Sequence, residues 1–408
     1  MKIISKLSFA VYAVLYSSWS IATVEDPGSF EMGGINVTPL LKAGVGYDDN
    51  VYREGTEGND LKEKSATVYT VAPSIELKAE QGMSYYALTV DGVHKSFSGE
   101  SDHDFTDYGA ALDIHHEFNS RHRLTVTSGY GIKHDQGSTV DEAKDKSAPQ
   151  YQQTDAAVNY GFGAKEATAR VDVFGDYNAK DYEKIGKLGR DSGEDRKNKG
   201  YGATFFYKVM PKTEVLVEAK KRELSYDNQD NAGYDITSYL VGLNWEATAK
   251  STGYIKAAHR ERKSDVKTVD KENYSGWEIG ISYLPVEYSL IQISSGRDYG
   301  LESENPASAS FTKGFNAVVN WQHDWTSKIT SNLGFSYTDD DVQNAASVVQ
   351  KERKVKTFNA GLSWKVMRNL TVSLDWENTK RDEKAKVNTA DEDDYTRNAY
   401  MLSAELAL

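Results

Sequence analysis

The connections between the amphipathic segments of this chain alternate between short and long, and this alternation restricts the possible folds more than any other feature. Segments of about 11 to 15 residues join the connections, and each can cross a bilayer as a tilted strand, which takes roughly 9–11 residues. We count about eighteen segments, with sixteen as the alternative. An even number of strands, with short turns at one end and long loops at the other, is typical of a bacterial outer-membrane barrel. Short turns are predicted near 80–82, 119–121, 163–166, 210–212, 247–250, 284–286, 325–327 and 367–369, and longer polar connections at 50–64, 98–104, 135–150, 183–197, 227–233, 264–272, 300–309, 340–352 and 383–393.

Within the segments, apolar and polar residues alternate with the two-residue period of a β-strand. The final segment, 394–408, is the clearest case, and we predict that it pairs with the first strand, 37–48, and closes the barrel. Arg397, Ser403 and Glu405 then face a wet lumen. The residues of this segment predicted to face lipid are Tyr400, Leu402, Ala404, Leu406 and Leu408.

Composition supports an all-β membrane protein. Only 39% of the residues are hydrophobic, against about 45–50% in an average globular domain. No run of 18 apolar residues follows the N-terminus, so no spanning helix is predicted. A β-propeller or stacked sandwiches are the soluble alternatives, but they use shorter strands without this alternation of connections. We therefore predict a transmembrane, antiparallel, up-and-down β-barrel without a plug domain.

The N-terminus has the pattern of a secretory signal peptide, residues 1–22. Lys2 and Lys6 precede an apolar stretch, and Ser20-Ile21-Ala22 forms a small-x-small cleavage site. The mature chain is expected to begin near Thr23, with a short periplasmic segment at 23–36 and the barrel at 37–408. The absence of cysteine excludes a disulfide framework. These features predict an integral protein of the bacterial outer membrane.

Aromatic residues are expected at both membrane interfaces. Four Trp residues lie beside predicted short turns, namely Trp245, Trp321, Trp325 and Trp364. A second set is predicted toward the long-loop ends: Tyr47, Tyr201, Tyr254, Trp376 and Tyr395.

Charged residues on the polar parity are the candidate lining of the lumen. They carry both signs, which favours a neutral or weakly charged hydrophilic solute over one small ion. For any one of them, an ion pair that braces the wall is an equally good interpretation. The set is Lys42, Asp48, Asp113, Glu117, Arg123, Arg170, Asp172, Lys208, Glu218, Arg222, Arg260, Glu278, Asp375, Glu377 and Arg397.

Other function classes find little support in the sequence. The net charge of −13 argues against nucleic acid. No Cys, GxSxG, HExxH or Walker motif is present, so we expect neither an enzyme nor a cofactor. Two acidic clusters, 339–341 and 391–394, are predicted on outer loops as solvated charge rather than calcium sites. His115 and His116 point to opposite faces of a strand, and no metal site is predicted.

The end of the first strand carries a family resemblance. Its residues are Gly46, Tyr47, Asp48, Asp49, Asn50, Val51, Tyr52 and Arg53. This stretch resembles the opening of EpsL-like and VpsM-like outer-membrane porins of exopolysaccharide biosynthesis operons. For Tyr52 and Arg53, we favour anchoring of a loop at the interface over folding inward. The chain ends in Leu408, where many such barrels end in Phe.

The resemblance implies a channel that exports an exopolysaccharide of the biofilm or capsule type. The implied partners are the polysaccharide, a periplasmic and inner-membrane export apparatus, the barrel assembly machinery, and outer-membrane lipid with lipopolysaccharide. A general or sugar-uptake porin is the main alternative. A barrel enzyme or an adhesin is a weaker one.

Overall fold

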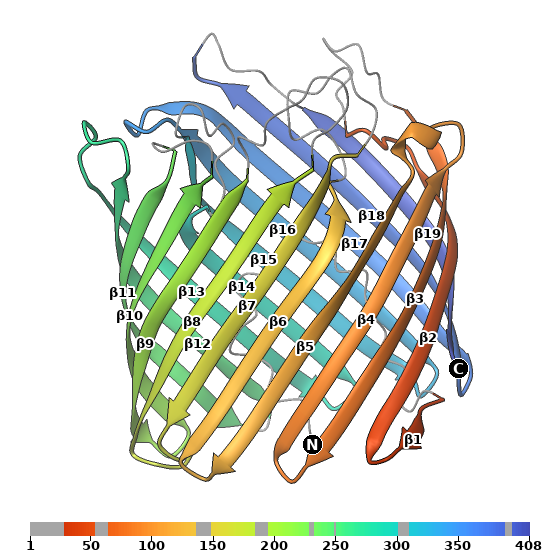
Figure 1. Cartoon of the computed structure of the whole chain (residues 1–408), viewed down its shortest axis with the longest axis horizontal. Helices are drawn as coiled ribbons and strands as arrows, with labels where there is room; N and C mark the ends of the chain where they lie inside the picture. Colours follow the sequence, from red (N-terminus) through yellow and green to blue (C-terminus); the bar gives the residue numbers. More distant parts are fainter. Residues whose placement is uncertain are drawn as a thin grey trace.

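The chain forms a closed, antiparallel barrel of 18 strands, β2 to β19, which confirms the predicted fold class (Figure 1). The computed structural model describes residues 28–53, 64–135, 148–183, 195–227, 232–248, 250–300, 310–387 and 394–408. The predicted signal peptide, the start of the mature chain and residues 391–393 of one acidic cluster lie outside these ranges. No helix among the described residues is long and apolar enough to cross a membrane.

Each strand pairs with its neighbour in sequence, so the order around the ring is the order of the chain. A short strand, β1, forms a hairpin with the start of β2, and the 3-10 helix η2 (Ser101–His103) lies between β4 and β5. The strands are β1 (Phe30–Met32), β2 (Ile35–Asp48), β3 (Ala66–Gln81), β4 (Ser84–Phe97), β5 (Phe105–Asn119), β6 (His122–His134), β7 (Gln150–Phe162), β8 (Ala169–Tyr182), β9 (Arg196–Met210), β10 (Thr213–Tyr226), β11 (Tyr234–Thr248), β12 (Ser251–Ser264), β13 (Glu272–Val286), β14 (Ser289–Tyr299), β15 (Phe311–Thr326), β16 (Ile329–Gln343), β17 (Val349–Met367), β18 (Leu370–Ala385) and β19 (Tyr395–Ala407).

The predicted closing strand pairs with β2. In the register, Tyr400 lies opposite Tyr47 and Leu402 opposite Val45, and all four of these side chains are exposed. This pairing closes the sheet, so neither β2 nor β19 is left as an edge strand in lipid, where unpaired backbone groups are costly.

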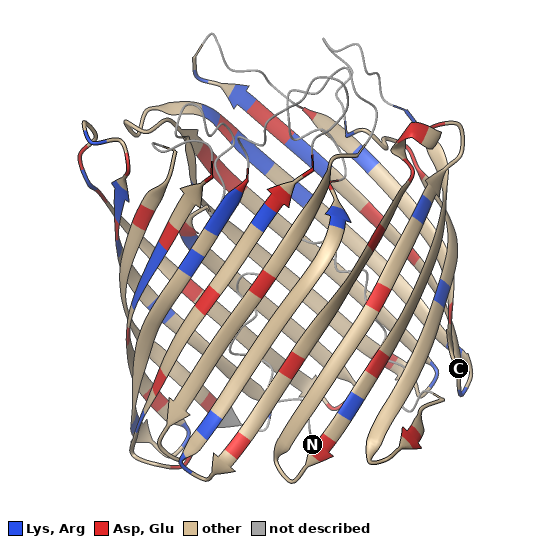
Figure 2. Cartoon of the chain, in the orientation of Figure 1, with Lys and Arg blue, Asp and Glu red and all other residues tan. Residues whose placement is uncertain are grey.

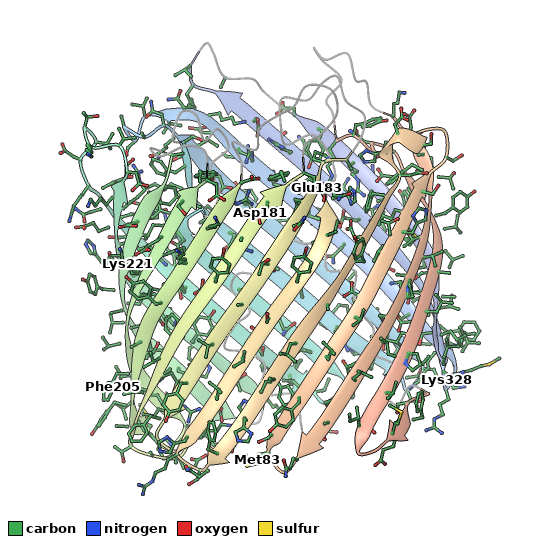
Figure 3. The ribbon with its side chains drawn as sticks, viewed as in Figure 1. Met83, Asp181, Glu183, Phe205, Lys221 and Lys328 are labelled. Carbon is green, nitrogen blue, oxygen red and sulfur yellow. The ribbon has the colours of Figure 1, made fainter. Side chains whose placement is uncertain are left out.

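Burial separates the two faces of the strands. In β2, Val45 is 43% and Tyr47 47% exposed, whereas Asp48 is 6% exposed. Side chains on the convex outer face spread apart, while those on the concave inner face crowd together. Figure 3 shows the outer position of Phe205, which is 45% exposed. An apolar outer face and a polar inner face are the expected arrangement for a membrane barrel with a wet interior.

An acidic cluster and one aromatic residue lie elsewhere than predicted. The acidic cluster 339–341 was expected on an outer loop, but it lies in β16, where Asp339 pairs with Phe315 and Lys354 of the flanking strands. The strands continue here because ladder hydrogen bonds need no apolar face once a strand rises beyond lipid. Tyr254 was expected at the long-loop end, yet it lies near the start of β12, directly after the short turn.

Candidate translocation pathway

All fifteen charged residues proposed for the lumen lie on the inner face of the barrel, on the parity opposite the exposed apolar side chains. Figure 2 shows that both basic and acidic residues occur on strands around the wall. Nine of the fifteen form ion pairs with charges on other strands, as described below. Their contact with a solute stays a prediction.

One group of ion pairs lies toward the short turns, on β6, β8 and β10. Arg123 contacts Asp172 at 2.6 Å, and Arg170 contacts both Asp172 at 3.1 Å and Glu214 at 2.8 Å. The Arg123 guanidinium lies over Gly161, where a Cβ would be 2.5 Å from its Cζ. These contacts connect alternate strands through side chains and brace the wall.

A second group covers the inner face of β10, β12 and β13. Glu218 binds Lys256 at 2.8 Å, and Glu278 binds Lys220 at 2.8 Å and Arg260 at 3.0 Å. Both carboxylates are largely buried. Lys220 and Lys256 also belong to the polar parity, but the sequence prediction omitted them. Because the charges neutralise one another, this part of the wall presents little net charge.

The third group fastens β19 to the loop end of β2. Arg397 contacts Asp48 at 2.7 Å and Glu377 at 2.6 Å. Next to it, the Asn398 backbone N–H and side-chain amide both donate to the Asp49 carboxylate, at 2.6 and 2.8 Å. The two aspartates of the family-like motif therefore hold the barrel closure.

The motif continues inward beyond Asp49. Val51 and Tyr52 are each 4% exposed, and they pack with inner-face residues of β3, β4, β5 and β19. We call this the β2 cluster. Its members are Val51, Tyr52, Ala66, Val68, Phe97, Phe105 and Met401. Tyr52 therefore folds inward, which was the alternative, and the prediction that it anchors a loop at the membrane interface is wrong.

Hydrogen bonds hold Tyr52 in place. Its phenol donates to Glu100 at 2.6 Å, and Lys64 contacts the same carboxylate at 2.7 Å. Burial, followed by the hydrogen bond to Glu100, raises the pKa of the Tyr52 phenol. The phenol therefore stays a neutral donor.

Gly46 of the motif makes room for the β2 cluster. A Cβ at Gly46 would lie 2.9 Å from Met401 Cε and would overlap the Tyr400 carbonyl oxygen. A glycine here lets β19 approach β2 closely while the Met401 side chain covers it.

A second apolar cluster lies at the loop ends of β10 to β15. We call it the β14 cluster. Its members are Leu224, Tyr226, Ala232, Tyr234, Ile236, Tyr274, Tyr299 and Phe311. Phe311 is fully buried. Because β11 is the ninth strand after β2 in a ring of 18, the β2 and β14 clusters lie on opposite arcs of the wall.

The remaining predicted residues are spread over the inner face. The Tyr85 hydroxyl donates to Asp113 at 3.2 Å, and Glu117 lies 3.4 Å from His115. Lys208 reaches Glu166 at 3.2 Å. Lys42 lies opposite Glu405 in the ladder, and Asp375 lies opposite Gly361. Arg222 is on the inner face of β10, opposite Gly200.

An inner-face cluster around Glu383 was not predicted from the sequence. Glu383 is 2% exposed, and its carboxylate contacts Lys351, Arg353 and Arg381. The parity of β18 assigns Glu383 to the inner face, but the prediction had placed residues 383–393 in a loop. In the described parts of the chain, no three His, Asp or Glu side chains form a group that could hold a metal ion.

The sequence matches one family of known proteins. The family model described as "Putative beta-barrel porin 2" matches residues 26–408. None of the curated proteins matches this sequence.

Several solved structures have a similar arrangement at low identity. Acinetobacter baumannii OccAB1 is 12% identical, with 94% of this chain and 99% of that chain covered and a TM-score of 0.48. Pseudomonas aeruginosa OpdO is 12% identical, with 91% and 97% covered and a TM-score of 0.47. The siderophore receptor PiuA from Acinetobacter baumannii is 10% identical, with 93% and 82% covered and a TM-score of 0.46.

Proposed function

We propose that this outer-membrane barrel, which belongs to the family described as Putative beta-barrel porin 2, is the channel through which an exopolysaccharide leaves the cell. The finding that supports this best is the inner wall. Its charges are largely paired with one another, so a neutral or weakly charged polar chain meets hydroxyl, amide and paired ionic groups. Such a wall suits many weak hydrogen bonds along a polymer rather than tight capture of one ion.

The resemblance of residues 44–54 to exopolysaccharide-operon porins adds to the proposal. The described residues ahead of β2 form β1 and its turn, and β1 pairs with the start of β2. In this proposal the barrel receives the polymer from a periplasmic export apparatus. The barrel assembly machinery inserts the barrel itself into the membrane.

Deletion of the gene followed by measurement of surface polysaccharide tests the proposal. We expect the extracellular polymer to fall and wild-type protein to restore it. Thr127 is exposed on the inner face of β6, so Thr127→Trp should narrow the lumen and restore export poorly. Val158, 44% exposed on the outer face of β7, gives the matched control Val158→Trp, which should restore export fully. Unchanged surface polysaccharide in the deletion strain would overturn the proposal.

A general or sugar-uptake porin is the alternative, and the paired polar wall is also compatible with it. Conductance of the purified protein in planar bilayers separates the two. A steadily open pore that passes small sugars favours uptake, whereas a mostly closed pore favours export through a partner-opened channel.

A further inference from the structure

The wall of the barrel splits between β13 and β14 at the loop end. Pairing of these strands stops at Glu278 and Gly296, although β13 continues to Glu272 and β14 to Tyr299. On their other sides both strands stay paired, β13 with β12 as far as Glu272 and β14 with β15 as far as Tyr299. Among the described residues, the β13 edge at 274–277 therefore has no ladder pairing with residues 297–299 of β14 or with Gly300 after it, which is an unusual cost for a barrel.

The end of β14 and the start of β15 instead lie against the inner side of β11 and β12. The Tyr234 hydroxyl of β11 donates to the carbonyl of Gly300, which follows β14, at 2.6 Å, across the two intervening strands β12 and β13. The Arg262 guanidinium of β12 lies 3.5 Å from the Phe311 ring centroid. We call the segments 297–300 and 310–313 the inner flap. The β14 cluster fills the space between the flap and the wall.

Two buried arginines fasten this flap. Arg260 is 0% exposed and donates to the Arg297 carbonyl at 3.0 Å, and its Nε lies 2.7 Å from Asp298. Arg262 is 1% exposed and donates to the Ala345 carbonyl at 3.2 Å. The second arginine thus also ties the β16–β17 connection to the same place.

Gly276 of β13 lies beside the contact between Arg260 and the flap. A Cβ at this position would overlap both the Arg297 carbonyl oxygen and the Arg260 guanidinium. A side chain at residue 276 would therefore separate the Arg260 guanidinium from the Arg297 carbonyl that it holds.

We propose that the inner flap is a gate with two positions. In the observed position it lies inside the barrel, held by Arg260 and Arg262, and narrows the loop end. In the other position β14 pairs with β13 along its full length, and the existing register extended upward places Gly276 opposite Asp298. The second position would satisfy the free edge of β13 and widen the lumen, while the first keeps the arginine contacts. Two packings of similar free energy are what a switching element requires.

This inference rests on the proposed channel function. It is therefore tested once by measuring conductance and once by a measurement that does not depend on conductance. In planar bilayers, Gly276→Ala should expel the flap and raise single-channel conductance or open probability at least about two-fold. Gly129→Ala is the matched control, because a Cβ at this inner-face glycine meets nothing nearer than 3.9 Å. Should Gly276→Ala fail to assemble, Arg262→Gln removes the tether without added bulk and should have the same effect. Wild-type conductance in folded Gly276→Ala and Arg262→Gln proteins would overturn the gate.

The chain has no cysteine, so a single introduced cysteine reports on the flap directly. Ser238 lies on the inner face of β11 and is 3% exposed. A hydrophilic maleimide should label Ser238→Cys slowly, and about ten-fold faster when Gly276→Ala is added. Ala111→Cys, exposed on the inner face of β5, should react equally in both backgrounds. Faster labelling without any conductance would leave the gate standing and count against the channel function. Equal labelling of Ser238→Cys in both backgrounds would count against the gate.

Discussion

Tyr52 shows how a single side chain can direct the segment after β2 into the lumen. It is an apolar ring with one polar atom, and both parts find partners on the inner face. The ring packs against His103, with centroids 5.2 Å apart, and the hydroxyl reaches Glu100. The sequence motif contained this residue, but its direction depended on Glu100, which lies 48 positions away.

Replacing Tyr52 by Phe keeps the ring and removes only the hydrogen bond. We expect the free energy of unfolding to fall by about 1 kcal/mol, or somewhat more because the acceptor is charged. Equilibrium urea unfolding in lipid vesicles measures it. Tyr47→Phe on the exposed outer face of β2 is the control and should be close to neutral. An equal loss in the two variants would contradict the assigned role of the hydroxyl.

Arg397 carries a larger share of the stability at the closure. The change to Met keeps the length of the side chain but leaves buried Asp48 without its guanidinium partner. Removing one member of a buried ion pair typically costs about 3–5 kcal/mol, and Glu377 loses a contact as well. We expect a clear loss of heat-resistant folded barrel on a gel. Addition of Asp48→Asn should restore part of the heat-resistant folded barrel, because the uncompensated carboxylate is then gone. No recovery in the double variant would argue that Arg397 acts by packing alone.

At the scale of the strand, β2 and β19 meet through Gly46 and Met401. Gly46→Val would force a side chain against the Tyr400 backbone and the Met401 thioether, so the two strands would have to separate. We expect the yield of assembled, membrane-inserted barrel to drop several-fold, with periplasmic accumulation of the precursor. Ala43→Val, exposed to the outside on the same strand, should assemble normally. Normal assembly of Gly46→Val would show that the closure tolerates a wider spacing.

The sequence predicted the strands well because lipid imposes a strict alternation on each of them. The pairing of 394–408 with the first strand, the even number of strands and the inner position of Glu218, Arg260 and Glu278 all follow from that alternation. Strand ends were less predictable. Asp339 and Glu383 lie beyond the apolar band, where polar residues occupy both faces and resemble a loop.

The inward course of the Val51–Tyr52 segment and of the inner flap could not be predicted from the sequence alone. Each depends on contacts between residues far apart in the chain, such as Tyr234 with Gly300 and Arg262 with Ala345. A two-residue period contains no information on such contacts. Two unusual signals were nevertheless present, namely apolar and aromatic residues at loop ends and arginines on the inner parity.

At the scale of the whole molecule, the two clusters make the barrel asymmetric along its axis. Both lie toward the long loops, on opposite arcs, while the short-turn end carries the ion pairs around Arg123 and Arg170. The narrowest part of the lumen should therefore lie near the loop end. Neutral polyethylene glycols of graded size, added to one side of a bilayer at a time, measure this through the drop in conductance. We expect polymers added on the loop side to be excluded at a smaller size than those added on the short-turn side. Gly276→Ala should reduce the difference, and Gly129→Ala should leave it unchanged. The same size limit from both sides would place the constriction near the middle of the barrel, where the ion pairs of Glu218 and Glu278 would then set the size of the solute.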